Sequence, residues 1–279
     1  MSKIHQVAQS GFGTGTNELY DRARPSYQQF ALDHIRESVK SKEPLNVVEI
    51  GSGTGIFTRA LLADPKWNQK IKQLKAVEPS EGMREVFSKA VKDDRVTVSE
   101  GTFASTHAED TWADLVVIAQ AFHWCPDYGT ACLEFSRILK PNGSVAFIWN
   151  LEDRDSAEWV GRIRDHIEVH ERGTPQFRHM YWRQTFDTPE YQSEFEPHKE
   201  QAWSYHLQGT KETVVDRASS KSYIAILPPR KKAEVQDEIR KIIDDSHKTW
   251  VDESKGIFEY PYKTHVVVAH KRQSNRHHV

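Results

Sequence analysis

A glycine-rich turn constrains the fold of this chain more than any other feature. An apolar run at residues 47–50 leads into Gly51, Gly53 and Gly55, and residues 56–61 continue with apolar side chains at helical spacing. Glycine tolerates positive φ and lets a bound group approach the backbone closely. The N–H groups at the start of a following helix attract polar or anionic groups. The pattern therefore predicts a strand, a ligand-binding turn and a helix, in that order.

The residues around the turn narrow the class of ligand. A dinucleotide-binding turn has glycine or alanine three residues after its second glycine, where this chain has Ile56. A phosphate-binding P-loop continues into Gly-Lys-Ser or Gly-Lys-Thr, and this turn does not. Instead, Glu49 lies two residues before Gly51, and Glu78 ends the next apolar run. These carboxylates suit a ligand with a cationic group and a ribose. The alternatives are a tight turn with incidental glycines and a strand-end surface acid at Glu78.

Apolar runs alternate with amphipathic segments along the first half of the chain. We predict strands at residues 46–50, 74–78, 95–99, 114–119 and 144–149, and a return to strand at 265–269. Such alternation is typical of βαβ units, whose parallel strands are buried on both faces. We therefore expect an α/β fold with a doubly wound, mostly parallel sheet. Its predicted parts are N-terminal cap helices (1–40), a ligand-binding core (41–150), a helical insertion or lid for the substrate (151–250), and a C-terminal strand with its tail (251–279).

Composition limits the remaining classes of protein. The 279 residues carry a net charge of −2 with a pI near 6.7, whereas nucleic-acid-binding domains are usually basic. The two cysteines, Cys125 and Cys132, suit neither a disulfide scaffold nor a structural zinc site, and we predict no metal. No run approaches the ~18 apolar residues of a membrane span. We expect a cytoplasmic protein, monomeric or homodimeric, that binds neither nucleic acid nor membranes.

Four segments resemble the motifs of class I S-adenosylmethionine (SAM)-dependent methyltransferases. Residues 47–55 resemble the first motif, 77–83 the segment after the second strand, 114–124 the fourth strand with its loop, and 139–144 the turn before the fifth strand. Residues 20–27 and the pair His123-Trp124 further resemble the branch that includes fungal trans-aconitate methyltransferase. The resemblance implies a seven-stranded Rossmann-like methyltransferase fold. It also implies SAM as the methyl donor and S-adenosylhomocysteine as its product.

The resemblance assigns roles to particular residues around the donor. Glu49 is expected to hold the amino group of SAM directly or through water, and Glu78 to accept both ribose hydroxyls. Met83 is expected to lie against the adenine. Thr102 and the backbone of Phe103 stand where the family often has an acidic residue near the adenine amino group. The other cofactor-binding candidates are Tyr20, Arg22, Gly51, Ser52, Gly53, Gly55, Pro79, Gln120 and Ala121.

Candidates for the acceptor side follow the fourth and fifth predicted strands. His123 is the side chain there that can act as a base near neutral pH, and its alternative role is to shape the pocket through hydrogen bonds. Trp124 and Trp149 are candidate walls of the substrate pocket. Arg22 is a candidate partner for the carboxylate of the donor or of an acidic substrate.

The expected reaction is methyl transfer to a small molecule, at the oxygen of a carboxylate or a hydroxyl. A base is needed only if the acceptor must lose a proton, and a carboxylate need not. A protein methyltransferase and a non-enzymatic SAM-binding regulator are the alternatives. Residues 151–250 are expected to decide the acceptor, and they carry no recognisable motif.

Overall fold

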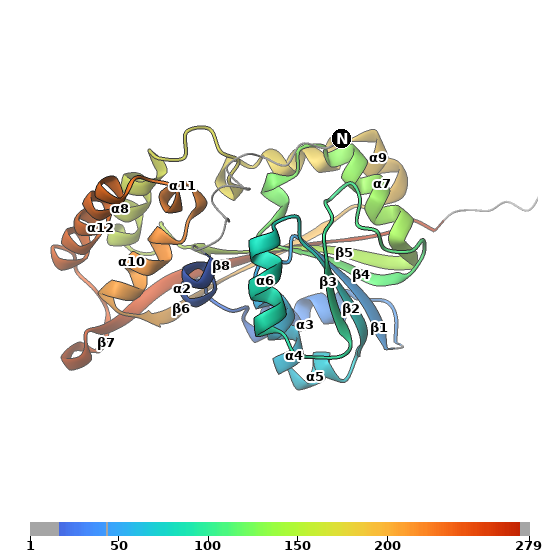
Figure 1. The fold of residues 1–279 in the computed structure, drawn as a ribbon, viewed down its shortest axis with the longest axis horizontal. Coiled ribbons are helices and arrows are strands. Elements are labelled where there is room, and N and C mark those ends of the chain that lie inside the picture. The colour runs from blue at the N-terminus through green and yellow to red at the C-terminus, as the bar shows by residue number, and fades with distance from the viewer. Residues whose placement is uncertain (1–16, 43, 274–279) are drawn as a thin grey trace, which may run out of the picture.

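One mixed sheet organises the computed structural model, which describes residues 17–42 and 44–273 (Figure 1). The strand order is β3-β2-β1-β4-β5-β8-β6, and β7 pairs with β8 off this path. The strands are β1 (Leu45–Ile50), β2 (Ile71–Val77), β3 (Val96–Ser99), β4 (Ala113–Ala119), β5 (Leu139–Glu152), β6 (Lys199–Gly209), β7 (Trp250–Asp252) and β8 (Ile257–His270). Pairings among β1 to β5 are parallel, and those with β8 are antiparallel. The predicted doubly wound, mostly parallel sheet is confirmed.

The central strands are buried on both faces, as their continuous apolar runs predict. β1 and β4 are buried along their whole length, and Val47 lies opposite Leu115 while Val48 lies opposite Val116. Successive side chains of a strand point to opposite faces. Accordingly, Val47 and Leu115 belong to one apolar cluster, and Val48 and Val116 belong to another. Burial of each such side chain contributes roughly 1.5–3 kcal/mol, so both faces of the sheet must be covered.

Helices cover the two faces through different sets of aromatic side chains. On the Val47 face lie α3 (Gln29–Ser38), α4 (Ile56–Ala63), α5 (Pro65–Asn68) and α6 (Glu81–Ala90), which contribute Phe57, Trp67 and Phe87 to the cluster. On the opposite face lie α7 (Tyr128–Ile138), η3 (Tyr181–Asp187) and α9 (Pro189–Glu194), which contribute Phe135, Trp182 and Tyr191. Ahead of them, α2 (Asn17–Ala23) is held to α4 by an ion pair of 2.6 Å between Asp21 and Arg59.

The antiparallel end of the sheet differs from the sequence expectation. The strand predicted at 265–269 is confirmed as part of the longer β8. However, residues 199–209 lie within the segment predicted as a helical lid, and they form β6, which pairs with residues 258–268 of β8. Its half-buried side chains alternate at Trp203, Tyr205 and Leu207. The segment 151–250 therefore contributes both helices and an edge strand, and the proposed domain boundaries stay a prediction.

A separate group of helices packs beside the extended ends of β6 and β8 (Figure 1). It consists of α8 (Glu158–Glu168), α10 (Lys211–Ser219), α11 (Ser222–Ala225) and α12 (Pro229–Asp244). They surround a third apolar cluster that includes Trp159, Ile239 and Tyr260. The remaining short helices are η1 (Phe122–Trp124), η2 (Phe177–His179) and η4 (Glu253–Lys255). Within the part of the chain that the structure describes, no helix has the length and apolar character to cross a membrane.

Candidate active site

The three glycines of the turn after β1 serve different purposes. All have positive φ, at +71° for Gly51, +55° for Gly53 and +84° for Gly55. A Cβ added at Gly51 would lie 2.6 Å from the Cβ of Ala121, and one at Gly55 would lie 2.8 Å from the ring of Phe87. A Cβ at Gly53 would meet nothing within 4 Å. Close packing therefore requires two of the glycines, whereas Gly53 faces open space in which a ligand can lie against the backbone.

Glu49 lies at the end of β1 and is buried beside this space. One carboxylate oxygen, Oε2, accepts a hydrogen bond from the hydroxyl of Thr58 on α4. Burial raises the pKa of Glu49 to about 8; the bond from Thr58 opposes this shift, and the charge of Glu78 adds to it. A cationic ligand group beside Glu49 would favour its ionised form.

Glu78 connects the end of β2 to the glycine turn. Its Oε2 accepts the N–H of Gly53 at 2.9 Å, and its Oε1 accepts the N–H of Ser80 at 2.8 Å. Burial raises its pKa, and these two N–H donors oppose the shift. A carboxylate offers about four acceptor positions, so both oxygens can still accept hydrogen bonds from the two hydroxyls of a ribose.

Two buried hydroxyls in the turn have no partner in the described structure. They are Ser52 Oγ and Thr54 Oγ1, in residues that are 6% and 1% exposed. Together with Glu49, Gly53 and Gln120 they line a small cavity beside the turn. Since buried polar groups are normally hydrogen-bonded, these hydroxyls indicate that a polar ligand completes the site. The turn therefore fits a compact ligand with amino, carboxylate and hydroxyl groups, as SAM has.

Among the other predicted donor residues, Gln120 lines this cavity, whereas Met83, Pro79, Thr102 and Phe103 do not. Gln120 has φ +59° and donates from Nε2 to the carbonyl of Asn150 at 2.6 Å. The ring of Phe103 would lie 3.9 Å from a Cβ at Gly51. Met83 is buried in the first turn of α6, Pro79 precedes that helix, and Thr102 bridges to Ser105 beside Phe103. Their contact with the donor stays a prediction.

The N-terminal segment places a different arginine in the site from the one predicted. Arg22 has an exposed side chain that pairs with Asp216 on α10 at 3.5 Å. It lines neither the small cavity nor the larger cavity beside it. Tyr20 lines both the small cavity and its larger neighbour, and so does Arg24, whose guanidinium lies 4.6 Å from the centroid of the Tyr20 ring. Arg24 also donates to Ser220 Oγ and to its carbonyl, both at 3.0 Å. Arg24 therefore lines both cavities, whereas Arg22, the arginine predicted from sequence, lines neither.

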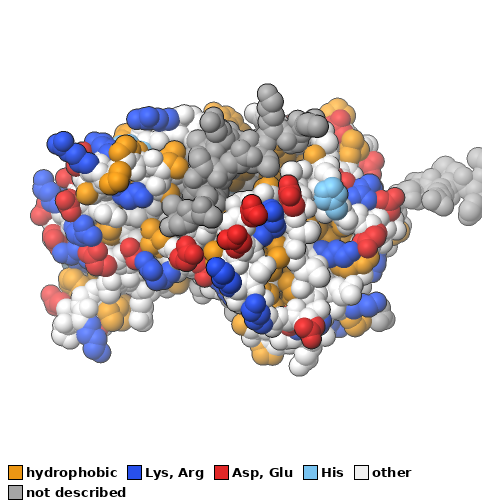
Figure 2. All heavy atoms as spheres, viewed as in Figure 1, with side chains coloured by type: hydrophobic (Ala, Val, Ile, Leu, Met, Phe, Trp, Pro, Cys, Tyr) orange, Lys and Arg blue, Asp and Glu red, His pale blue; other side chains and the backbone are white. Residues whose placement is uncertain are grey.

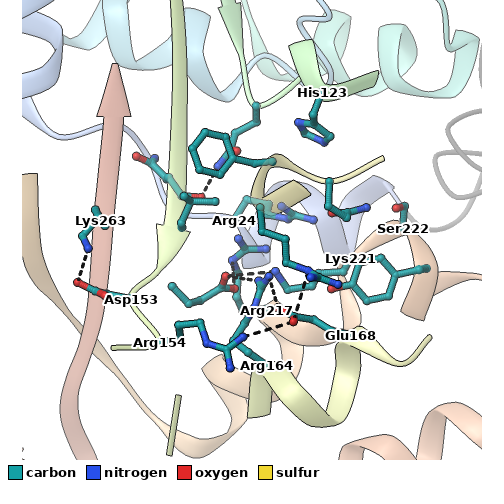
Figure 3. Close-up of a pocket in the computed structure, with 18 of the residues that line it drawn as sticks. Arg24, His123, Asp153, Arg154, Arg164, Glu168, Arg217, Lys221, Ser222 and Lys263 are labelled. Atoms are coloured by element: carbon teal, nitrogen blue, oxygen red, sulfur yellow. Dashed lines mark hydrogen bonds and ion pairs between the residues drawn. The ribbon is translucent and has the colours of Figure 1, made fainter. Parts of the chain in front are cut away.

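The larger cavity has a volume of about 420 Å³ and shares Tyr20, Arg24 and Gln120 with the small one (Figure 3). Seven cationic side chains and four carboxylates of the described residues line it. The cationic residues are Arg24, Arg154, Arg164, Arg178, Arg217, Lys221 and Lys263, and the acidic ones are Glu152, Asp153, Asp155 and Glu168. A cavity with this surplus of positive charge favours an anionic ligand.

The buried charges of this cavity centre on Glu152, at the end of β5. Its carboxylate pairs with Arg164 and Arg217, each at 3.1 Å, and with Lys221 at 3.2 Å. Burial alone would raise the pKa of Glu152, but these three cations hold it well below its usual range. Burial and the neighbouring arginines also lower the pKa of Lys221. Arg217 Nη1 and the hydroxyl of Tyr223 are buried without a partner in the described structure.

The surroundings of His123 argue against the predicted role of a base, because they lower its pKa and because Trp149 engages its Nδ1. His123 lies on η1, is half-buried, and lines the larger cavity. Burial and the charges of Arg24 and Lys221 lower its pKa to about 3, so it is neutral at physiological pH. Trp149 is fully buried and does not line the cavity, which corrects its predicted role as a pocket wall. Instead, its indole N–H donates to His123 Nδ1 at 3.3 Å. Trp124 does line the cavity.

No sequence motif marks the charged residues around Glu152, and the fold alone brings them together. The Arg-Pro step at Arg24 was the available local signal for that residue. Among residues 17–42 and 44–273, no group of three or more His, Cys, Asp or Glu side chains is arranged to hold a metal ion.

Comparisons with known proteins identify a matching family and relatives that are similar over most of the chain. A family model for a methyltransferase domain matches residues 48–147, which include the glycine turn and Glu78. An uncharacterized methyltransferase-like protein of Schizosaccharomyces pombe is 30% identical over 223 residues, which cover 80% of this chain and 82% of that protein. An uncharacterized methyltransferase of Mycobacterium tuberculosis is 28% identical over 242 residues, covering 83% of this chain and 85% of that one.

Solved structures share the fold at low sequence identity. The YcgJ protein of Bacillus subtilis has a TM-score of 0.54 at 17% identity, covering 88% of this chain and 100% of that one. A Haemonchus contortus phosphoethanolamine N-methyltransferase, solved with phosphomonomethylethanolamine and S-adenosylhomocysteine, has a TM-score of 0.57 at 15% identity. The match covers 98% of this chain and 61% of that one. The narrower branch predicted from sequence, that of fungal trans-aconitate methyltransferase, stays a prediction.

Proposed function

This chain belongs to the class I SAM-dependent methyltransferases, and we propose that it methylates a carboxylate oxygen of a small acidic molecule. One observation carries the proposal: a cavity with a surplus of cationic side chains adjoins the donor turn and shares Tyr20, Arg24 and Gln120 with it. Donor and acceptor can therefore meet at the border of the two cavities.

The residues of the small cavity, together with Glu78 bonded to Gly53, would hold the donor. The Gly53 backbone would lie against it, Glu49 would pair with its amino group, and Glu78 would accept its ribose hydroxyls. Arg24 is placed to pair with its carboxylate or with the acceptor. When bound there, SAM supplies an electrophilic methyl group on a positively charged sulfur.

The larger cavity would hold the acceptor. A buried cation is costly unless it is paired, and among the described residues Glu152 is the one carboxylate paired with Arg217 and Lys221, while it also pairs with Arg164, which has Glu168 as a second partner. Arg24 forms no ion pair with the described residues. The unpartnered donors at Arg217 and Tyr223 add hydrogen-bonding capacity that an anionic ligand would satisfy. A carboxylate is the simplest small-molecule group with the required charge and acceptor atoms.

The chemistry of a carboxylate acceptor agrees with the absence of a role for His123 as a base. One carboxylate oxygen forms the new O–CH₃ bond while the C–S bond breaks and its electron pair stays on the sulfur. The acceptor is already anionic near neutral pH, so no proton has to leave it. The task of the protein is then to align the two groups, and orientation of this kind contributes ~7–11 kcal/mol to catalysis.

The size of the cavity favours a small acceptor over a protein or a nucleic acid. A volume of about 420 Å³ falls within the roughly 300–1,000 Å³ typical of small-molecule sites. On the face of the molecule in Figure 2, basic and acidic side chains are interspersed over the visible described surface. We also propose, as expectations from sequence, that the protein is cytoplasmic and acts as a monomer or homodimer.

The test is methyl transfer from methyl-labelled SAM to a panel of carboxylic acids and to the matching alcohols, amines and thiols. We expect label in the acids as methyl esters, which mild base hydrolyses to methanol. Lys221→Met should raise the KM for the acid without weakening SAM binding. Lys263→Met is the matched control, because Lys263 lines the same cavity but pairs, among the described residues, with Asp153 alone, whereas Lys221 shares Glu152 with Arg164 and Arg217. Base-stable label in an amine or a thiol would refute the proposal.

A further inference from the structure

The bond between Trp149 and His123 fixes where the imidazole carries its proton. The indole nitrogen of Trp149 can only donate, so His123 Nδ1, 3.3 Å away, must accept. A neutral imidazole that accepts at Nδ1 carries its hydrogen on Nε2. His123 is therefore a hydrogen-bond donor through Nε2.

The protein core keeps Trp149 in this position. Trp149 is 0% exposed and lies on β5, with ring centroids 4.7 Å from Trp182 and 4.9 Å from Phe177. Close-packed interiors allow little reorientation of such a large side chain. The direction of its N–H is accordingly set by the packing of the core and does not depend on a ligand.

The surroundings of Nε2 point to an anionic partner. His123 lines the larger cavity, and no hydrogen bond within the described structure engages its Nε2. The charged groups that act most strongly on the ring are Arg24 and Lys221, and both are cationic. They disfavour a second proton on the ring, and they attract an anion to the same part of the cavity.

We infer that His123 binds one oxygen of the acceptor carboxylate through Nε2–H, and that Trp149 is a positioning residue that imposes this tautomer. The inference rests on the proposed function for the identity of the acceptor. The second carboxylate oxygen stays available for the methyl group, and the imidazole neither takes nor gives a proton during transfer.

The tautomer can be measured without any acceptor. Long-range ¹H–¹⁵N NMR of the histidine-labelled protein, with the His123 signals assigned by their loss in His123→Gln, should show a bare Nδ1 and a protonated Nε2. The same pattern should persist from pH 8 to pH 5. Trp149→Phe should change the His123 signals towards a mixture of tautomers. Trp67→Phe is the matched control, because Trp67 is also fully buried and donates to a backbone carbonyl, that of Leu32, but lies in the apolar cluster on the other face of the sheet; this variant should preserve the tautomer.

Kinetics with a carboxylic acid that the protein methylates then show whether His123 acts as a hydrogen-bond donor or as a base. Glutamine can place an N–H near the position of imidazole Nε2, so His123→Gln should keep kcat/KM within about fivefold of wild type. His123→Leu should raise KM by about 10- to 100-fold, the loss expected for a hydrogen bond to a charged group. An Nδ1–H tautomer, titration of His123 near pH 6.5, or equal loss of kcat in both variants would overturn the inference. If no carboxylic acid is a substrate, the proposed function is refuted. The NMR measurement would still show which tautomer His123 adopts, because it needs no acceptor.

Discussion

The protonation of Glu49 should make SAM binding depend on pH. Glu49 is buried, and this burial raises its pKa to about 8 in the free protein. With that pKa, about nine-tenths of the protein carries a protonated Glu49 at pH 7. Binding the cationic amino group of SAM requires the ionised form, so the complex holds fewer protons than the free protein. Linkage then requires that affinity rises as pH rises towards the pKa of the free protein.

The size of the effect follows from the pKa. Well below it, each pH unit changes the ionised fraction about tenfold, so SAM should bind about tenfold more tightly at pH 7 than at pH 6. This difference corresponds to about 1.4 kcal/mol. An α-amino group titrates at about 7.7–8.0, so the comparison is made below pH 7.5, where the amino group of SAM keeps its charge.

Calorimetry can measure the released proton directly. Titrations with SAM at pH 7, in buffers with different heats of ionisation, should show release of about 0.9 proton per SAM bound. Glu49→Gln cannot ionise, so it should bind more weakly and release almost none. Equal proton release by the wild type and Glu49→Gln, or a wild-type affinity independent of pH from 6 to 7, would refute the proposed contact between Glu49 and the amino group.

Three further outcomes follow from the packing. Gly53→Ala should lower the free energy of unfolding by about 1 kcal/mol, because residue 53 has a positive φ. Gly55→Ala should lower it by a further 1–3 kcal/mol, roughly the cost of overpacking, because the added Cβ would also meet the ring of Phe87. Chemical denaturation measures both values, and equal losses in the two variants would contradict the packing around Gly55. Arg217→Met should lower the free energy of unfolding by about 3 kcal/mol, because it leaves the buried Glu152 without one of its cationic partners. The control is Arg230→Met at an exposed position, which should change it by less than about 0.5 kcal/mol. Similar losses in the two variants would argue against a buried ion pair between Arg217 and Glu152. Burial raises the pKa of both cysteine thiols to about 12, so a thiol reagent at pH 8 should label them only after unfolding, and rapid labelling of the native protein would contradict their burial.

The sequence predicts the parallel half of the fold well because its signals are local. Continuous apolar runs mark β1 and β4, since strands buried on both faces need apolar side chains at every position. β6 escaped prediction because it is an edge strand with polar side chains on one face. Its alternation at Trp203, Tyr205 and Leu207 was the available signal, within a segment interpreted as a helical lid.

The donor turn is also marked by local sequence signals, whereas the acceptor cavity is not. Glu49, the glycines and Glu78 are recognisable because short spacings fix their relative positions. By contrast, Arg24, Glu152 and Arg217 are far apart in the sequence and meet only through the packing of α10 against the ends of β5 and β8. The role of His123 also depended on Trp149, a neighbour 26 positions away. Sequence spacing could identify the donor, and only the fold defines the acceptor site.

The position of the donor is tested most directly by one calorimetric comparison. Wild-type protein and Gly53→Arg are titrated with S-adenosylhomocysteine, and NAD serves as the control ligand. Because Gly53 faces open space, the arginine side chain should fill the donor site while the fold is retained. We predict that the wild type binds S-adenosylhomocysteine and not NAD, and that Gly53→Arg binds neither while still unfolding cooperatively. Unchanged affinity for S-adenosylhomocysteine in Gly53→Arg, or binding of NAD in its place by the wild type, would contradict the account.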